Sequence, residues 1–381
     1  MTVRRPLAPP VYVDDANRLR QLVQDLAQEP LLALDTESNS LYAYRERVCL
    51  IQVSSRARDY IIDPLRIKDM KPFGELLMNP HIEKVFHAAE YDLMCMKRDF
   101  GFGIINLFDT MLAARICGYK QVGLGALLGE FLGVALDKSH QRDDWGKRPL
   151  PAASLLYAQM DTHYLPALRD HFVEELERFN AWTEAKEAFE DACDVPAARH
   201  PVFDPEAYWR IALPNQLTRR QAAILRELYL LREDVASKRN LPPFKILSDK
   251  LLAALALNAP ANLVDLTQVN GMSHGLVRRY ARSILEAVER GQRAKLPPPP
   301  TPEPPLDPAV VERYTALREW RKHRAMKRGV ESDVIISKDA LWTLAERAPR
   351  SIDAMHGVPG FGPWRLNMYG AEILEVISRY P

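Results

Sequence analysis

Residues 31–37 of the chain read Leu31-Leu32-Ala33-Leu34-Asp35-Thr36-Glu37, in which four apolar residues are followed by two carboxylates two positions apart. A short apolar run of this kind predicts a buried β-strand. Because successive side chains of a strand point to opposite faces, Asp35 and Glu37 are expected on one face at its end. Acids in that place are costly unless they are paired or bind a metal ion. Mg²⁺ and Mn²⁺ prefer oxygen ligands, so a metal site and two solvent-facing acids are both open interpretations.

The segments around this stretch predict an α/β fold. Apolar runs indicate further strands at residues 48–53, 60–62 and 84–88, and helical patterns occupy residues 16–27, 91–99, 110–117 and 152–179. The first three strands follow one another closely, so we expect them to be antiparallel. A strand separated from them by a helix is expected to join later, which gives a mixed sheet flanked by helices.

Two later segments carry further acids. Asp92 follows the apolar run at residues 84–88 and starts a helical pattern, where an acid that favours the helix dipole is the alternative to a ligand. Tyr157 and Asp161 are four residues apart on one predicted helix and so share a face. For this pair alone, a core aromatic beside an unrelated surface acid is the simpler interpretation.

The second half of the chain has a different organisation. We place a linker from Trp182 to Pro205, and every long segment beyond it has a helical pattern. A proline tract at residues 297–305 predicts a semi-rigid spacer between two helical blocks. When the chain is shifted by 89 residues, the blocks match without a gap; for example, Lys238-Arg239 falls on Lys327-Arg328. This register indicates two copies of one small all-helical domain.

Charge is unevenly divided between the halves. Residues 1–205 hold 24 Lys and Arg against 31 Asp and Glu, and residues 206–381 hold 27 against 19. This asymmetry suggests that the basic half binds a polyanion and that the acidic half holds metal ions, with chance variation as the alternative. The chain has no run of about 18 uncharged apolar residues, so we expect no membrane-spanning helix. Its four cysteines have no metal-type spacing and predict free thiols in a cytoplasmic protein.

Together the acids resemble the DEDD superfamily of 3′→5′ exonucleases in its tyrosine branch. The resemblance rests on Asp35-Thr36-Glu37, Asp92 and the Tyr157-x-x-x-Asp161 spacing. Leu156 stands where the histidine branch has its base, which excludes that branch. Residues 49–52, 87–92, 108–110 and 144–150 resemble ribonuclease D, and the repeated block resembles the helicase-and-RNase-D C-terminal (HRDC) domain. The resemblance covers nearly the whole chain.

This resemblance implies a fold, an activity and a set of site residues. The expected fold is a ribonuclease H-like mixed sheet with flanking helices, in an exonuclease domain at 1–195. HRDC domains are expected at 210–293 and 307–381, with the spacer at 294–306. The expected activity is removal of nucleoside 5′-monophosphates from RNA 3′ ends by two-metal-ion hydrolysis, with Mg²⁺ or Mn²⁺ as cofactors. The metal ligands would be Asp35, Glu37, Asp92 and Asp161, and Tyr157 would orient the attacking water.

Contacts to nucleic acid are expected from residues of both halves. In the exonuclease domain these are Leu41, His87, Trp145 and Arg148; a core role for His87 and a loop-anchoring role for Trp145 are the alternatives. Asp109 is expected to be a helix N-cap. In the HRDC domains the expected contacts are Lys238, Arg239, Lys327 and Arg328, with a merely solvated basic face as the alternative. Backbone amides of Gly357–Trp364 are a further candidate phosphate site.

The partner expected for the chain is structured RNA such as tRNA precursors, bound by a monomer that does not enter a membrane. A 3′→5′ DNA exonuclease and a non-catalytic nucleic-acid-binding protein are the alternative functions. None of the four acids is missing, which argues against the non-catalytic alternative. Truncation after Gly291, at the spacer, is expected to leave a folded enzyme.

Overall fold

The computed structural model describes residues 7–212, 216–301 and 304–380. The chain forms two compact units, of which the first comprises residues 1–38, 48–199 and 305–381. The second unit comprises residues 39–47 and 200–304. Residues 302–303 of the expected proline spacer lie outside the described residues. Among the helices of the described part, none has the length and apolar character needed to cross a membrane.

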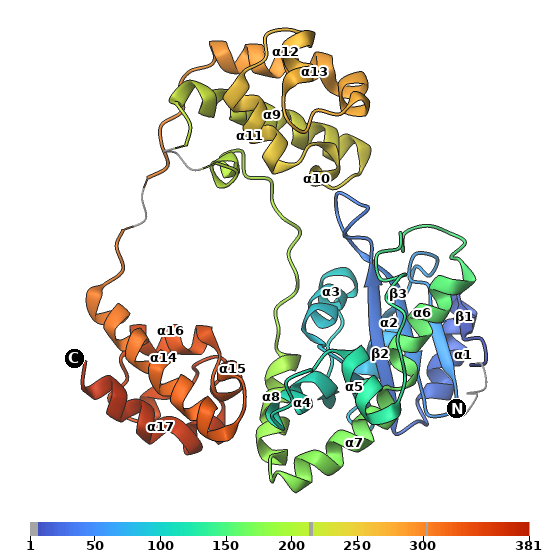
Figure 1. The fold of residues 1–381 in the computed structure, drawn as a ribbon. Coiled ribbons are helices and arrows are strands. Elements are labelled where there is room, and N and C mark those ends of the chain that lie inside the picture. Colours follow the sequence, from blue (N-terminus) through green and yellow to red (C-terminus); the bar gives the residue numbers. More distant parts are fainter. Residues whose placement is uncertain (1–6, 213–215, 302–303, 381) are drawn as a thin grey trace. The chain divides into compact units, whose positions relative to one another are not determined.

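A mixed six-stranded sheet forms the centre of the first unit (Figure 1). Strands β2, β3 and β4 pair antiparallel, whereas β1 pairs parallel with β4, β5 with β2, and β6 with β5. The mixed sheet and its antiparallel start are therefore confirmed, but two strands of only three residues, β1 and β6, were not expected. The order across the sheet is β1 (Val11–Val13), β4 (Asp59–Ile62), β3 (Val48–Ser54), β2 (Leu31–Ser38), β5 (Glu83–Phe86) and β6 (Leu107–Asp109).

The two central strands explain how the sequence stabilises this sheet. Every residue of β3 is buried, and the first four residues of β2 are buried as well. From Asp35 onward the residues of β2 are only half-buried, so the strand passes from the core to the surface within its own length. Its register with β3 shifts between Glu37 and Ser38, an irregularity of the kind often found beside active sites.

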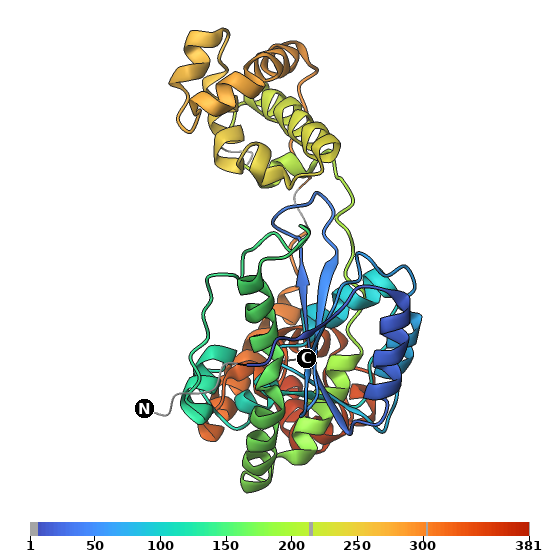
Figure 2. The same ribbon diagram turned by 90° about the vertical axis from the view of Figure 1, so that its right-hand side faces the viewer.

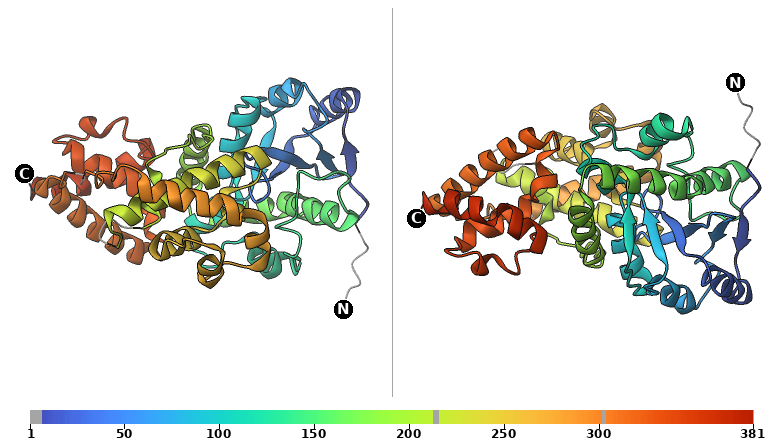
Figure 3. Two further views of the ribbon diagram at one scale, coloured as in Figure 1. Left: turned by 90° about the horizontal axis from the view of Figure 1, so that it is seen from above. Right: turned by 90° about the horizontal axis from the view of Figure 1, so that it is seen from below.

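Helices cover both faces of the sheet, with α1 and α2 on one face and α6 on the other (Figures 2 and 3). The stretch expected as one helix at 152–179 is two helices, because α6 ends at His163 and α7 begins at Leu165 with a proline in its first turn. The first seven helices are α1 (Ala16–Leu26), α2 (Lys71–Leu77), α3 (Glu90–Phe100), α4 (Thr110–Ile116), α5 (Leu124–Leu132), α6 (Ala152–His163) and α7 (Leu165–Arg178).

The segment expected as a linker begins with a helix, α8 (Trp182–Cys193), so that expectation is wrong for its first half. The helix packs against β6 and buries Ala185 and Phe189. It also buries the carboxylate side chains of Glu184 and Glu187. These acids gave the segment its surface-like composition, and both have arginine partners far along the chain, in the second repeat.

The second repeat, residues 308–378, packs against the sheet domain, residues 7–199, within the first unit. Helix α17 contacts α8, and the hydrophobic residues of both parts form one continuous core. Ion pairs join Arg328 to Glu184 and Arg365 to Glu187 across this contact. The elements of the repeat are α14 (Pro308–Arg328), α15 (Ser332–Ile335), α16 (Lys338–Arg347), the short 3₁₀ helix η2 (Asp353–Met355) and α17 (Pro363–Ser378).

This packing changes the expectation for truncation after Gly291. The cut removes both arginines together with the apolar residues of the second repeat that share one core with the sheet domain, so the apolar face of α8 becomes exposed to water. We therefore expect the truncated chain to unfold at a clearly lower temperature than the full chain. Thermal unfolding of both proteins measures the effect, and an unchanged midpoint would show that the second repeat contributes nothing to the sheet domain.

The first repeat, residues 219–293, forms most of the second unit and has its own hydrophobic core. Segment 39–47, which connects β2 and β3 in sequence, belongs to this unit. Its Tyr44 packs on the core of the repeat and donates a hydrogen bond to Glu233. The elements are η1 (Ala207–Arg210), α9 (Arg219–Arg239), α10 (Pro243–Ile246), α11 (Asp249–Asn258), α12 (Leu263–Gln268) and α13 (His274–Arg293).

The internal repeat is confirmed by matching local structure. Helices α9 and α14 begin 89 residues apart, as do α11 and α16, and α13 and α17. Ser248 and Ser337 cap equivalent helices with their side chains. Ala259 and Ala348 end those helices with φ of 43° and 44°, a left-handed conformation that alanine rarely adopts. Such an unusual backbone at equivalent positions shows that the two copies share one fold.

Candidate active site

The first two acids are positioned by the surface end of β2. Asp35 and Glu37 lie on one face of the strand, as strand alternation requires, and both are half-buried. Asp92 is in the first turn of α3, directly after β5, and is 9% exposed. Asp161 lies near the end of α6, which packs across β2, β3 and β4. Three different elements therefore bring four acids to one edge of the sheet.

These four acids line a small pocket of about 280 Å³. Carboxylate oxygens of Asp35, Glu37 and Asp161 lie within 4.8 Å of one another, a spacing at which three acids can share a metal ion. The remaining lining residues are Leu34, Thr36, His87, Leu124, Gln141, Tyr157 and Leu165. The pocket thus contains every acid that the sequence singled out, together with the tyrosine.

Asp92 has an anchor of its own. The hydroxyl of Thr36, which lies between the two acids of β2, donates a hydrogen bond to Oδ1 of Asp92. Thr36 therefore links α3 to β2 at the pocket and fixes one oxygen of the carboxylate. This role of Thr36 could not be predicted from the sequence, because a threonine between two acids in a strand carries no signal of its own.

Tyr157 lies one helical turn before Asp161 on α6. Its hydroxyl hydrogen-bonds to the Asp161 carboxylate, so the phenol points to the acids rather than into the core. The ring packs beside Trp145 with 6.1 Å between the ring centres. This arrangement holds the phenol oxygen in place within the pocket by packing on one side and a hydrogen bond on the other.

Burial and mutual repulsion raise the pKa values of the acids in the pocket. Burial raises the pKa of Asp92 and of Asp161 to about 7, and that of Glu37 to about 9. The pKa of Asp35 is raised well above its ordinary value by burial and by the charges of Asp92, Asp161 and Glu37. Burial and the charge of Asp161 also raise the pKa of Tyr157, so its phenol stays protonated at neutral pH.

Divalent metal ions fit this set of residues. The donors are carboxylate oxygens, the ligands that Mg²⁺ and Mn²⁺ prefer, and their mutual repulsion is relieved by positive charge between them. Asp143, which the sequence analysis missed, adds further negative charge near Glu37.

His87 is held in the pocket by Thr110, the first residue of α4. Its Nδ1 lies 2.9 Å from the hydroxyl of Thr110, which in turn donates to the carbonyl of Phe86. Asp109 caps α4 by accepting from the amides of Met111 and Leu112, so the expected N-cap is confirmed. It also accepts from the amides that lead into α3, Ala88 and Ala89. One buried carboxylate thus shapes both turns beside the pocket.

Trp145 and Arg148 are used inside the protein, which corrects their expected role as nucleic-acid contacts. Trp145 is 1% exposed, so its ring has no surface on which a base can stack. Arg148 forms a two-pronged ion pair with Asp63 and donates to the carbonyl of Cys49. Tyr12 donates to the same Asp63 at 2.6 Å. Both residues therefore anchor the loop before α6 to the sheet.

The other residues that were expected to contact nucleic acid differ in whether their side chains already have partners within the protein. Leu41 is 39% exposed and lies in segment 39–47 of the second unit rather than in the acidic pocket. Lys238 pairs with Asp234 at the surface. Arg328 is engaged by Glu184, and the amides at Trp364 and Arg365 are engaged by Glu187. In the second repeat, the groups that were expected to contact phosphate are thus bound to carboxylates of the sheet domain.

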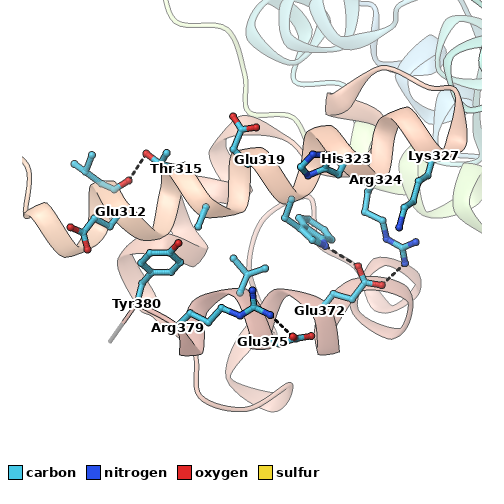
Figure 4. A pocket seen from close by; sticks show the side chains of 14 residues that line it. Glu312, Thr315, Glu319, His323, Arg324, Lys327, Glu372, Glu375, Arg379 and Tyr380 are labelled. Atoms are coloured by element: carbon cyan, nitrogen blue, oxygen red, sulfur yellow. Dashed lines mark hydrogen bonds and ion pairs between the residues drawn. The ribbon is translucent and has the colours of Figure 1, made fainter.

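Lys327 lies beside a hollow of about 750 Å³ between α14 and α17 (Figure 4). Glutamates already pair the arginines there, Arg324 with Glu372 and Arg379 with Glu375. Trp320 also donates to Glu372. Lys327 itself has no ion-pair partner among the described residues, and its contact to nucleic acid stays a prediction.

Comparison with known proteins gives a consistent result along the chain. A family model described as 3′-5′ exonuclease matches residues 10–177, and one described as HRDC domain matches residues 221–288 and 311–377. The ribonuclease D of Gluconacetobacter diazotrophicus is 33% identical, covering 96% of this chain and 92% of that protein. The ribonuclease D of Pseudomonas paraeruginosa is 32% identical, covering 96% of each.

A solved structure extends the similarity to the fold. The crystal structure of Escherichia coli RNase D, described as an exoribonuclease involved in structured RNA processing, matches with a TM-score of 0.66. The two chains are 26% identical, and the match covers 98% of this chain and 100% of that one. The similarity therefore includes the sheet domain and both repeats.

Proposed function

Because this chain belongs to the ribonuclease D family and is a 3′–5′ exoribonuclease, we propose that it trims the 3′ ends of structured RNA, such as tRNA precursors, and releases nucleoside 5′-monophosphates. The observation that carries the proposal is the pocket in which four acids and Tyr157 meet. The substrate class is supported by the E. coli relative, whose structure is described as that of an enzyme of structured RNA processing.

In this proposal Asp35, Glu37, Asp92 and Asp161 hold two divalent ions, Mg²⁺ or Mn²⁺. When bound, these ions activate water and offset the charge that develops on the phosphate during hydrolysis. Asp35, Glu37 and Asp161 have carboxylate oxygens within 4.8 Å of one another, so these three acids would hold a cation together. Thr36 fixes one oxygen of Asp92, which would be the fourth acidic ligand.

Tyr157 acts in this proposal by orienting the attacking water. Its raised pKa keeps the phenol protonated, which favours a hydrogen-bonding role over proton abstraction by a phenolate. His87, held by Thr110 at the pocket wall, is proposed to contact the terminal nucleotide. The remaining proposed contacts are Leu41, Lys238, Arg239 and Lys327.

The domain boundaries expected from the sequence form part of the same proposal: an exonuclease domain at 1–195, HRDC domains at 210–293 and 307–381, and a spacer at 294–306. We propose that the protein acts as a monomer. The four cysteines are free, which fits the reducing environment of the cytoplasm as its proposed location.

The pocket predicts a specific dependence of stability on pH and cations. Asp92 and Asp161 have a pKa of about 7 in the folded chain, above the ordinary value of 3.8. At pH values between these two pKa values, the folded state therefore binds more protons than the unfolded state. The free energy of unfolding falls as the pH rises through this range. Bound cations remove this penalty, so Mn²⁺ should raise the unfolding temperature more at about pH 8 than at about pH 5.

Thermal unfolding with and without Mn²⁺ at both pH values measures this effect. The variant Asp35→Asn is the control, because it should lose most of the cation-dependent shift. A shift of equal size at the two pH values, or one that survives in the variant, would place the cation somewhere other than this pocket.

The proposed substrate class is tested with a folded RNA that carries a single-stranded 3′ extension. We expect stepwise shortening of the extension, with nucleoside 5′-monophosphates as products. A DNA strand of the same sequence tests the alternative of a DNA exonuclease. Faster shortening of the DNA, or release of oligonucleotides, would contradict the proposal.

A further inference from the structure

The two repeats carry the same arginine–tyrosine pair at equivalent positions. In the second repeat, Nη1 of Arg328 donates to the hydroxyl of Tyr369 at 2.8 Å. In the first repeat, Nη1 of Arg239 donates to the hydroxyl of Tyr280. Each pair joins the end of the first long helix of its repeat to the last helix, so both copies present a guanidinium fixed in the same way.

In the second repeat this guanidinium binds a carboxylate of the sheet domain. Nη1 and Nη2 of Arg328 lie 2.9 and 2.7 Å from the two oxygens of Glu184. The side chain of Glu184 is only 2% exposed, so the acid is withdrawn from water into this contact. A two-pronged arrangement of this kind is equally suited to a carboxylate and to a phosphate.

A second carboxylate occupies the start of α17. Oxygens of Glu187 accept from the amides of Trp364 and Arg365, at 2.5 and 3.3 Å, and from the Arg365 guanidinium at 2.9 Å. The helix has no side-chain cap of its own, because Gly362 stands at its N-cap. A Cβ at Gly362 would lie 2.5 Å from the Glu187 carboxylate, so the glycine makes room for the acid.

Among the residues that the structure describes, no acid occupies the equivalent face of the first repeat. Ser273 stands where the second repeat has Gly362, and its side chain caps α13 by accepting from the amide of Leu276. Leu276 takes the place of Arg365. Arg239 is exposed, and among the described residues it has Tyr280 as a partner but no acid. The guanidinium is thus equally fixed in both copies, but only the second copy has its anion.

The charge of the first repeat favours a polyanion as its missing partner. Residues 200–304 carry 15 Lys and Arg against 10 Asp and Glu, whereas residues 305–381 carry 12 against 10. An excess of positive charge attracts a nucleic-acid backbone, and a fixed, exposed arginine provides a contact point for one phosphate.

We propose that the repeats use one shared anion-binding face for two purposes. In the second copy the face holds Glu184 and Glu187 and so fastens the repeat to the sheet domain. In the first copy the face is open at Arg239 and binds a backbone phosphate of the RNA. This inference rests on the proposed function, since it names the part of the chain that holds the body of the substrate.

The test compares Arg239→Gln with its matched counterpart Arg328→Gln in the full chain. RNA binding is titrated over a salt series in EDTA, where hydrolysis is not expected, with a folded RNA that carries a 3′ extension. Arg239→Gln should raise Kd roughly fivefold and reduce the slope of log K against log salt by about 1, the effect of losing one phosphate contact. Arg239→Lys should keep the slope, because it keeps the charge.

Arg328→Gln should behave in the opposite way. Its salt slope should match that of the unaltered protein, while its unfolding temperature falls by several degrees because Glu184 remains buried without a partner. Adding Glu184→Gln should restore part of that loss. The Arg239 variants should unfold at the temperature of the unaltered protein, which shows that their binding defect is not a folding defect.

Two salt-series results would overturn the proposal: equal slopes for Arg239→Gln and the unaltered protein, or a reduced slope for Arg328→Gln. A third contradicting result would be an oligomer of the unaltered protein that dissociates in sedimentation when Arg239 is replaced by Gln. The last result would assign the open face to an acidic protein surface. Shortening of a short unstructured RNA by the unaltered protein is measured alongside. If shortening occurs and the slopes are equal, only the inference fails; if it does not occur, the proposed function fails.

Discussion

Asp35→Asn is expected to abolish hydrolysis of RNA while the protein stays folded. Asp35 is one of three acids whose carboxylate oxygens lie within 4.8 Å of one another, so its loss removes a ligand from the candidate metal site. The fold should not suffer, because the Asp35 carboxylate is repelled by three neighbouring acids and its pKa is strongly raised. In the absence of cations we therefore expect the variant to unfold at the same temperature or a higher one.

The measurement is the rate of 3′ shortening together with the thermal midpoint of each sample. Glu90→Gln is the matched control, because Glu90 is an exposed acid in the same helix as Asp92 and does not line the acidic pocket. It should keep nearly full activity. A folded Asp35→Asn variant with normal turnover would show that the acids of this pocket do not perform the reaction.

Tyr157→Phe is expected to slow hydrolysis by roughly 10²–10⁴-fold, the range for a positioned group that assists proton transfer. The change removes only the hydroxyl that bonds to Asp161 and keeps the ring that packs beside Trp145. RNA affinity in EDTA should therefore change little. The loss should appear in kcat rather than in binding.

Tyr314→Phe is the control for this substitution, since Tyr314 stacks on Trp342 in the second repeat, away from the pocket. Its activity should equal that of the unaltered protein. An equal loss of affinity and rate in Tyr157→Phe would assign the tyrosine a packing role instead.

The acidic pocket could be predicted from the sequence because its signals are local and tied to regular elements. Strand alternation places Asp35 and Glu37 together, and helical spacing places Tyr157 next to Asp161. That the start of α3 and the end of α6 meet at the same pocket is a property of the tertiary fold, and only the resemblance to ribonuclease D indicated it beforehand. Thr36 and Gln141 were not predicted, because their place in the pocket depends on that tertiary arrangement.

The contact between the sheet domain and the second repeat could not be predicted. Glu184 and Glu187 gave residues 182–193 the composition of a solvated linker, because an acid buried against an arginine 144 or 178 residues away has no local signal. For the same reason Arg328 seemed free to bind RNA. Arg148 and Trp145 were misjudged in a related way, since their partners lie on distant strands of the sheet.

Hydrolysis from a free 3′ end by a cation-dependent acidic pocket is tested most directly by one assay. Structured RNA labelled at its 5′ end, with the 3′ hydroxyl either free or blocked, is incubated with Mg²⁺, Mn²⁺ or EDTA. We expect a ladder of products shortened one nucleotide at a time, only from the free 3′ end and only with a divalent cation. Internal cleavage of the blocked RNA, or shortening that persists in EDTA, would contradict it.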